Sequence, residues 1–539
     1  MPTELTTAFM PYGLLCLIGI GICVCLLQLK PFKLAKQVGT YGLLTFTAIG
    51  LFFHIGLHQR GQSVPFDSDT YYLGAKYYKE LGYKYLYPAY SQALKEQTGQ
   101  ALPFIRDISD RGHYFPTNEY PALELQAKHQ FSPARWSQFT NDIVLDFTMN
   151  KDPTHVWFGV DHGFTASPWL TLELQPFTLI PINHRASLLS VDFILFALLF
   201  GLLGKYFGWR NALVGLSIYL FFPPAYYSFT IPGTSLLRFL WLFWLSAGLA
   251  AFFKRRWLLA GILLGLASLD RIFPIFFVIA AIWVLAVQAP QQEGTWRKRL
   301  APWARLTSGV VLSLILGIGT TELIWPGHWL LQIAFLKDFA SFPFANAYGW
   351  LKVVHFYPVG HFAVQAHDVY LFYDRPPTEL IHQRYYQPFF LLWSAFTTVT
   401  ICALAPLRLN RTAAVTLIGF FLIFQFTTLT YYYLAILIPI TCIFMQQGWP
   451  GLRYLIGCAL IPGAIFLCYS MTYFSFCFFS LLMALFFTSV GAWFLFPIHT
   501  RVIVPFILVV VCICLLHITR NDFKLAAQIE KAEASKTYP

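Results

Sequence analysis

Long apolar segments alternate with short polar ones along most of the chain. Segments of about 20 apolar residues match the thickness of a bilayer, and they cover residues 9–29, 40–57 and most of residues 187–518. Short basic clusters separate several of them, as at residues 254–256 and 297–299. Because basic loops of membrane proteins face the cytoplasm, the pattern predicts an all-α polytopic membrane protein with about 13 to 14 transmembrane helices.

Two long polar segments interrupt the apolar pattern, and the charge rule places both on the external face. They should contain interfacial helices, one over residues 70–81 that ends at Gly82 and one that begins at Ser132-Pro133. We therefore divide the chain into an extra N-terminal span and inside loop at 1–39, a transmembrane module at 40–325 with its large external loop at 58–186, a second external loop at 326–387, C-terminal transmembrane helices at 388–519 and a polar tail at 520–539.

One apolar stretch, residues 257–287, is too long for a single span. It is interrupted at Asp270-Arg271-Ile272-Phe273-Pro274. We expect two short helices, one that rises to Asp270 and one that descends from Phe273, so that the next basic cluster again lies inside.

Composition narrows the class of protein further. Hydrophobic residues make up 57% of the chain and charged residues 12%, which is far from a soluble globular domain. The net charge of +12 comes from short clusters between spans, so we do not expect a nucleic-acid partner. All ten cysteines lie in apolar stretches, and their spacing predicts neither a disulfide framework nor a zinc site.

Ionisable residues inside spans are costly, and they usually line a cavity or pair with one another. On this topology five of them lie in the outer third of the membrane, next to the external loops. A cavity that combines arginines with carboxylates suits a lipid phosphate, because arginine offers a planar fork of donors. The alternative is that they only hold helices together, as Asp192 and Arg238 could. The five are Asp192, Arg238, Asp270, Arg271 and Glu322.

The acidic triplet Asp67-Ser68-Asp69 opens the first external loop. In an extended segment residues two apart point the same way, so the pair could hold a divalent cation (Mg²⁺ or Mn²⁺), or one carboxylate could act as a base. Asp69 could instead cap the helix that follows it, which makes Asp67 the better base. Asp161, before a glycine turn, is a second candidate acid, and its alternative role is that of a turn residue.

The order of these features resembles the GT-C superfamily of integral membrane glycosyltransferases. Its members have a span, an external loop opened by acidic residues, further spans and a second external loop. The segment from Gly261 to Pro274, with Asp270-Arg271 near its end, looks like the "GLLLGLA…R-P" segment that is frequent in the family. Thr430-Tyr431-Tyr432-Tyr433 with Pro439 is similar to the aromatic start of a late helix near the donor site.

The resemblance implies a polyprenyl-phosphate-linked sugar as donor and a lipid, glycan or protein hydroxyl as acceptor. It implies one inverting displacement on the external (periplasmic or lumenal) face, most simply of a bacterial inner membrane. Some relatives need a divalent cation and others do not. By position, Asp67 or Asp69 would be the base, and the leaving phosphate would be held by Arg238, Arg271 or Arg375 with Tyr431 and Tyr432 nearby.

Two other classes of protein share part of this pattern. A transporter or flippase of a lipid-linked or anionic substrate would also use broken helices and buried charges, but it would not need two large external loops. A non-catalytic scaffold of the envelope would not need clustered intramembrane charges. The sequence therefore favours the transferase.

Overall fold

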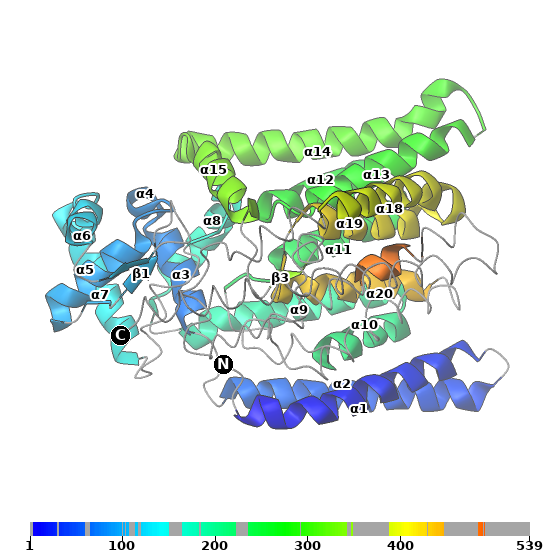
Figure 1. Cartoon of the computed structure of the whole chain (residues 1–539), viewed down its shortest axis with the longest axis horizontal. Helices are drawn as coiled ribbons and strands as arrows, with labels where there is room; N and C mark the ends of the chain where they lie inside the picture. The colour runs from blue at the N-terminus through cyan, green and yellow to red at the C-terminus, as the bar shows by residue number, and fades with distance from the viewer. Residues whose placement is uncertain are drawn as a thin grey trace.

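The structure is a computed structural model. It describes residues 4–29, 32–59, 65–99, 101–102, 104–106, 114–116, 120–149, 164–182, 185–221, 236–291, 293–341, 347–348, 387–427, 429–446, 483–488 and 490. Helices dominate, and they form a long bundle with a smaller group of helices at one end (Figure 1).

The bundle confirms the predicted class of a helical, polytopic membrane protein. Within the described ranges, three segments are long and apolar enough to cross a membrane, namely Ser190–Phe207, Trp296–Ile324 and Leu391–Arg408, and shorter apolar helices run beside them. The bundle helices are α1 (Glu4–Gln28), α2 (Lys33–Gln59), α9 (Arg185–Phe207), α10 (Trp209–Phe221), α11 (Leu240–Phe253), α12 (Trp257–Asp270), α13 (Ile275–Gln288), α14 (Trp296–Ile324), α18 (Gln387–Arg408), α19 (Arg411–Phe426) and α20 (Leu437–Met445).

The first long polar segment folds into a subdomain with a core of its own, rich in buried tyrosine and phenylalanine. We call it the external subdomain, after the side of the membrane that the sequence predicts for it. An ion pair of 2.7 Å between Lys76 and Asp142 ties its first helix to α7, and Tyr77 donates to the same carboxylate at 2.6 Å. Its elements are α3 (Pro65–Lys76), α4 (Tyr78–Leu81), α5 (Leu86–Thr98), β1 (Phe104–Arg106), β2 (Tyr114–Pro116), α6 (Pro121–Lys128), α7 (Pro133–Met149) and α8 (Pro168–Leu174). The strands β1 and β2 pair antiparallel.

Helix α7 begins where the sequence predicted. Ser132 precedes Pro133, and its hydroxyl accepts from the backbone N–H of Arg135 at 3.4 Å. The apolar stripe on α7, with Phe139 and Ile143 fully buried, packs into the core of the subdomain. The helix is therefore structured by the subdomain and not by a membrane surface alone.

The helix expected over residues 70–81 differs from the prediction at its start. Helix α3 begins at Pro65, where proline is well suited to the first turn. A break at Tyr77 separates α3 from α4, and Gly82 ends α4 as expected, with a φ of +51°. The acidic triplet consequently lies inside a helix and not in an extended segment before one.

The expected break in residues 257–287 is confirmed, because α12 ends at Asp270 and α13 begins at Ile275. Helix α12 packs closely on α14 through glycines. A Cβ on Gly261 would collide with the carbonyl oxygen of Leu306, and one on Gly309 with that of Leu258. Small residues at such positions let membrane helices approach each other closely, which explains the glycines of this segment.

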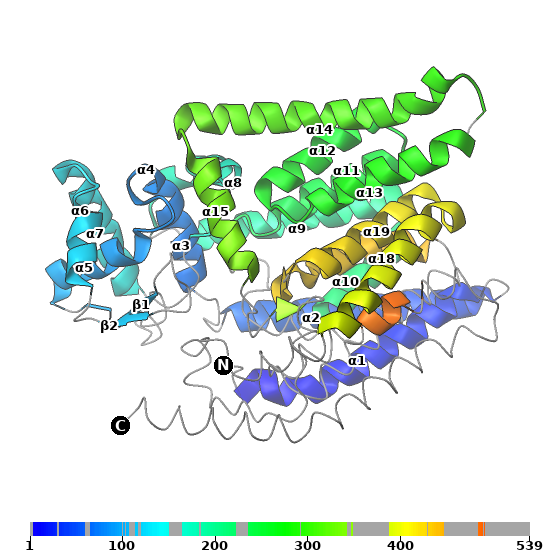
Figure 2. The ribbon, with the colours of Figure 1, turned by 45° about the horizontal axis from the view of Figure 1, so that its top comes forward.

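The segment predicted as the second external loop contacts the bundle again at one point. Helix α15 (His328–Ser341) lies between the external subdomain and the bundle (Figure 2). Further on, β3 (Ala347–Tyr348) pairs antiparallel with β4 (Leu429–Thr430). Strand β4 directly precedes the 3-10 helix η7 (Tyr431–Ile436). Residues far apart in sequence thus meet beside the predicted aromatic run.

Candidate functional site

Arg271 joins three parts of the chain. It follows the last residue of α12, and its Nη2 donates to the hydroxyl of Tyr71 on α3 at 2.6 Å. The guanidinium carbon lies 5.4 Å from the centre of the Tyr71 ring and 5.9 Å from that of Tyr433 on η7. A cation between two aromatic rings is held electrostatically as well as by its hydrogen bond. The arginine thus lies where the predicted first external loop, the broken helix pair and the late aromatic run meet.

Tyr71 is itself fixed in place. The side chain is 6% exposed, and its hydroxyl shares a hydrogen bond of 3.1 Å with that of Thr165. Its ring meets Phe164 edge-on at 5.9 Å. Because Tyr71 is held on two sides, it presents its hydroxyl to Arg271 in one orientation.

Tyr433 is held by aromatic neighbours from the bundle. Its ring lies 4.7 Å from Phe273, in the turn after α12, and 5.7 Å from Trp241 on α11. These contacts attach η7 to the turn that carries Arg271. The structure therefore brings together two segments, around Arg271 and around Tyr431, that sequence analysis assigned to one donor site.

Position 67 can be placed relative to this junction by helix geometry. Residues four apart lie on one face of a helix, so Asp67 is on the α3 face that carries Tyr71. Residues two apart do not face each other, and Asp69 is therefore on another face. The proposed cap role of Asp69 is wrong because α3 begins at Pro65. For both aspartates the structure describes the backbone and not the side chain.

Asp270, the residue before Arg271, belongs to a second group of polar side chains. Asp270, at the end of α12, is 1% exposed and interacts with Glu173 of α8. Burial raises the pKa of Glu173, while the nearby Asp270, Trp169 and Trp244 act in the opposite direction. Both carboxylate oxygens of Asp270 and the two indole nitrogens lack a hydrogen-bond partner in the described part of the chain.

The predicted pair Asp192 and Arg238 is buried in the bundle, at 1% and 7% exposure. Both charges act on the hydroxyl of Tyr219 on α10, so the three residues are neighbours. This arrangement agrees with a role in holding α9, α10 and the start of α11 together.

Glu322 stabilises the start of α15. Its carboxylate accepts from the backbone N–H of Gly327 at 2.6 Å and of Trp329 at 3.1 Å. Those donors belong to the start of α15, where a carboxylate complements the helix dipole. Burial lowers the pKa of the adjacent His328, and the charge of Glu322 partly opposes this.

Other predicted site residues can be placed only in part. Asp161 and Arg375 lie outside the described residues, and for Tyr431 and Tyr432 only the backbone of η7 is described. The described residues hold no group of three or more histidine, cysteine, aspartate or glutamate side chains that could bind a metal. Sequence analysis missed Glu173 and the role of Tyr71. The spacing of four between Asp67 and Tyr71 was the signal that could have indicated the latter.

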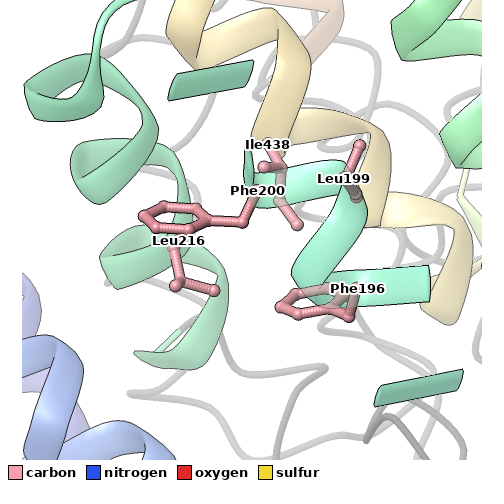
Figure 3. A pocket seen from close by; sticks show the side chains of 5 residues that line it. All are labelled: Phe196, Leu199, Phe200, Leu216 and Ile438. Atoms are coloured by element: carbon pink, nitrogen blue, oxygen red, sulfur yellow. The ribbon is translucent and has the colours of Figure 1, made fainter. Parts of the chain in front are cut away.

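An apolar pocket elsewhere in the bundle is unsuited to this chemistry. It has an empty volume of about 160 Å³ and no room for a water molecule. Figure 3 shows that its lining carries no polar side chain. It is lined by Phe196, Leu199, Phe200, Leu216 and Ile438.

The central part of the chain matches a known protein family model. Residues 169–320 match the family model described as dolichyl-phosphate-mannose-protein mannosyltransferase. No curated protein matches, and no solved structure does. The matched region runs from α8 to α14 and includes Glu173, Arg238, Asp270 and Arg271.

Proposed function

We propose that this chain, whose residues 169–320 match the dolichyl-phosphate-mannose-protein mannosyltransferase model, is a membrane glycosyltransferase that moves a sugar from a polyprenyl-phosphate donor to an acceptor hydroxyl on the external face. The observation that carries the proposal is the junction at Arg271. One arginine contacts Tyr71 of the first external loop and Tyr433 of the late aromatic run. Sequence analysis placed the base on the first of these segments and the donor phosphate near the second.

Arg271 is the proposed ligand of the lipid phosphate. A guanidinium has five N–H donors in a fork that matches phosphate oxygens, and the hydrogen bond to Tyr71 is made by Nη2. The side chain is partly exposed, so a phosphate can approach it. Its two aromatic neighbours keep the charge in place without neutralising it. Arg238 and Arg375 are further candidates for the same phosphate.

Asp67 is the proposed base. Its position on the Tyr71 face of α3 puts it on the side that meets Arg271. In the reaction, the acceptor hydroxyl gives its proton to Asp67, and its oxygen attacks the anomeric carbon with inversion. The bond from that carbon to the phosphate oxygen breaks, and the leaving polyprenyl phosphate gains negative charge that Arg271 stabilises. Asp69 and Asp161 are the alternative bases.

The acidic triplet does not fit the divalent cation proposed for it. Two carboxylates bind one ion when they point to the same place, but positions 67 and 69 are on different faces of α3. The proposed reaction therefore does not use a cation bound by Asp67 and Asp69.

The external location of the site is supported by the distribution of basic residues. Lys205 lies in the last turn of α9. Residues 254–256 directly precede α12, and residues 297–299 lie at the start of α14. Figure 1 shows the start of α14 at the end of the bundle opposite to the external subdomain. Because basic turns of membrane proteins face the cytoplasm, this distribution supports an outer location for the junction at Arg271.

Substitution of Arg271 tests the proposal. The probe is polyprenyl-phosphate-mannose, added to membranes that contain the full chain, and the readout is release of polyprenyl phosphate. We expect Arg271→Gln to lower kcat by about a hundredfold or more, the size of effect seen when one donor to a developing charge is removed. Arg271→Lys should retain part of the rate, because it keeps the charge but loses the fork.

A matched control is Arg297→Gln. Arg297 is exposed at the start of α14, and this variant should keep the wild-type kcat. Wild-type kinetics of Arg271→Gln would contradict the proposal. Movement of the intact lipid across the membrane without bond cleavage would instead support the transporter.

A further inference from the structure

Arg411, the first residue of α19, connects the turn after α18 with the start of α12. Its guanidinium carbon lies 6.0 Å from the centre of the Trp257 ring, at the start of α12. Its Nε donates to Gln288 Oε1 at 2.9 Å, and Gln288 donates to the backbone carbonyl of Pro406 on α18 at 2.6 Å. Within the described ranges its Nη groups have no hydrogen-bond partner. Arg411 is therefore oriented by a ring and an amide, and neither neutralises its charge.

Arg255, in the turn before α12, has an unusual backbone conformation for an arginine. Its φ is +58°, in the left-handed region that glycine adopts easily and other residues do not. Its backbone N–H donates to the carbonyl of Phe252 at 3.0 Å, and that of the next residue donates to the carbonyl of Ala251 at 2.9 Å. These bonds form a Schellman motif, in which glycine usually occupies the left-handed position. The turn itself thus gives no reason for an arginine.

The two turns carry a group of basic side chains that we call the basic corner, namely Lys254, Arg255, Arg408 and Arg411. In the part of the chain that the structure describes, none of the four forms an ion pair with a carboxylate. Arg255 is near enough for its charge to act unfavourably on that of Arg411. Neighbouring arginines without a carboxylate provide a site for an anion, because each offers a fork of donors to phosphate oxygens.

Large apolar side chains beside the basic corner are exposed. Leu258 and Leu259 belong to the first turn of α12, and Leu407 lies near the end of α18. A free phosphate would contact only the charges, whereas the acyl chains of a phospholipid would also cover the leucines. Basic sites between membrane helices on the cytoplasmic side bind acidic lipid headgroups. Arginines next to exposed leucines therefore fit an anionic phospholipid.

We propose that the basic corner binds the phosphate of an anionic phospholipid in the leaflet that faces the cytoplasm. Arg411 is the oriented ligand of the phosphate, and Arg255 supplies a second charge from the turn before α12. The basic-residue rule assigns this side of the bundle to the cytoplasm. Because Trp257 and Arg271 lie at opposite ends of α12, the site is separate from the junction at Arg271, and the inference does not depend on the proposed reaction.

Native mass spectrometry of the full chain in detergent tests the inference. The probe is dioleoylphosphatidylglycerol, and the reference lipid is zwitterionic dioleoylphosphatidylcholine. We expect wild type to bind the anionic lipid more tightly than the reference. Arg411→Gln should weaken that binding by about fivefold, the effect of one basic residue near a headgroup. Arg411→Lys should lose less, because it keeps the charge and loses only the fork.

Arg255→Gly separates lipid binding from folding. Glycine suits the positive φ, so the unfolding midpoint in lipid-free detergent should stay the same or rise. Binding of phosphatidylglycerol should still fall by about fivefold, because a charge is lost. Since this variant keeps the turn, it also provides the comparison should Arg411→Gln not fold. Wild-type affinity for the anionic lipid in Arg255→Gly would overturn the inference.

Lys33→Gln is the matched control, because Lys33 is an exposed basic residue at the start of α2, on another turn of the same predicted side. This variant should bind phosphatidylglycerol as wild type does. Equal losses in Lys33→Gln and Arg411→Gln would mean that the lipid responds to net charge alone, which would overturn the site. Release of the bound lipid by inorganic phosphate would show a site for free phosphate and would overturn the choice of a lipid.

Discussion

The guanidinium of Arg271 donates to the hydroxyl of Tyr71 at 2.6 Å, across 200 residues of sequence. Tyr71 is on α3, one helical turn after Asp67. The contact therefore relates the proposed base, on the first external loop, to the proposed phosphate ligand at the break between α12 and α13.

Loss of the Tyr71 hydroxyl should weaken the hold on Arg271. A hydrogen bond to a charged group contributes about 1.5 to 3 kcal/mol. We expect Tyr71→Phe to raise the KM for polyprenyl-phosphate-mannose by roughly tenfold to a hundredfold with a smaller change in thermal stability. Steady-state kinetics in native membranes, with varied donor, measures this.

The neighbouring Tyr72 provides the control for that variant. Its hydroxyl donates to the backbone carbonyl of Ile180 at 2.9 Å and has no contact with Arg271 among the described residues. Tyr72→Phe should therefore lower stability and leave the KM unchanged. Equal KM values in the two variants would argue against a positioning role for Tyr71.

The close approach of α12 to α14 should make Gly261 intolerant of a side chain. A methyl group there meets the carbonyl oxygen of Leu306, which belongs to a helix backbone and cannot move aside. We expect Gly261→Ala to cost about 1 to 3 kcal/mol, seen as a lower midpoint of thermal unfolding in detergent. Gly319→Ala, on α14 but with open space around it, should not show this loss, and equal losses would refute the packing argument.

Glu124 should make the external subdomain less stable as pH rises. Burial raises the pKa of Glu124 above its usual 4.5, and the ion pair with Lys95 at 3.7 Å only partly offsets this. A raised pKa means that the folded state binds the proton more tightly, so stability falls as pH rises from 4.5 through the folded pKa. Glu124→Gln should remove this fall, as measured by unfolding midpoints at a series of pH values.

Glu96 offers the opposite sign in the same subdomain. Burial would raise its pKa, but hydrogen bonds from Lys128, Trp136 and Gln92 outweigh burial and lower it. Glu96 therefore contributes stability above its usual pKa and loses it as pH falls through the lowered value. If Glu96→Gln and Glu124→Gln changed the pH profile in the same direction, the assignment of these shifts would be wrong.

The sequence predicted the parts of the fold that depend on apolar length and on charge. The membrane class and the break after Asp270 followed from these patterns, and the structure confirms both. The start of α3 was predicted too late, because the acidic triplet was taken as a boundary while Pro65 sets the first turn. Interfacial helices were expected in the second polar segment, but no specific helix was predicted over α15. Its start depends on Glu322, a residue that looked like part of a cavity.

Only the charged residues of the site could be predicted from the sequence. Arg271 was singled out because ionisable residues are rare in spans, and the aromatic run near Tyr433 because of a family resemblance. Tyr71 and Glu173 were not singled out, because both belong to the external subdomain. How that subdomain packs on the bundle depends on the tertiary structure. Asp67 and Asp69 could not be separated by spacing alone. Only the helical backbone of α3 puts them on different faces.

The central claim is that Asp67 removes the acceptor proton beside a phosphate held by Arg271. Its most direct test is release of polyprenyl phosphate from polyprenyl-phosphate-mannose by Asp67→Asn in native membranes. We expect a loss of about a hundredfold to ten-thousandfold in kcat, with binding of the methyl ester of farnesyl phosphate and the unfolding midpoint unchanged. Turnover at the wild-type rate by Asp67→Asn would contradict it.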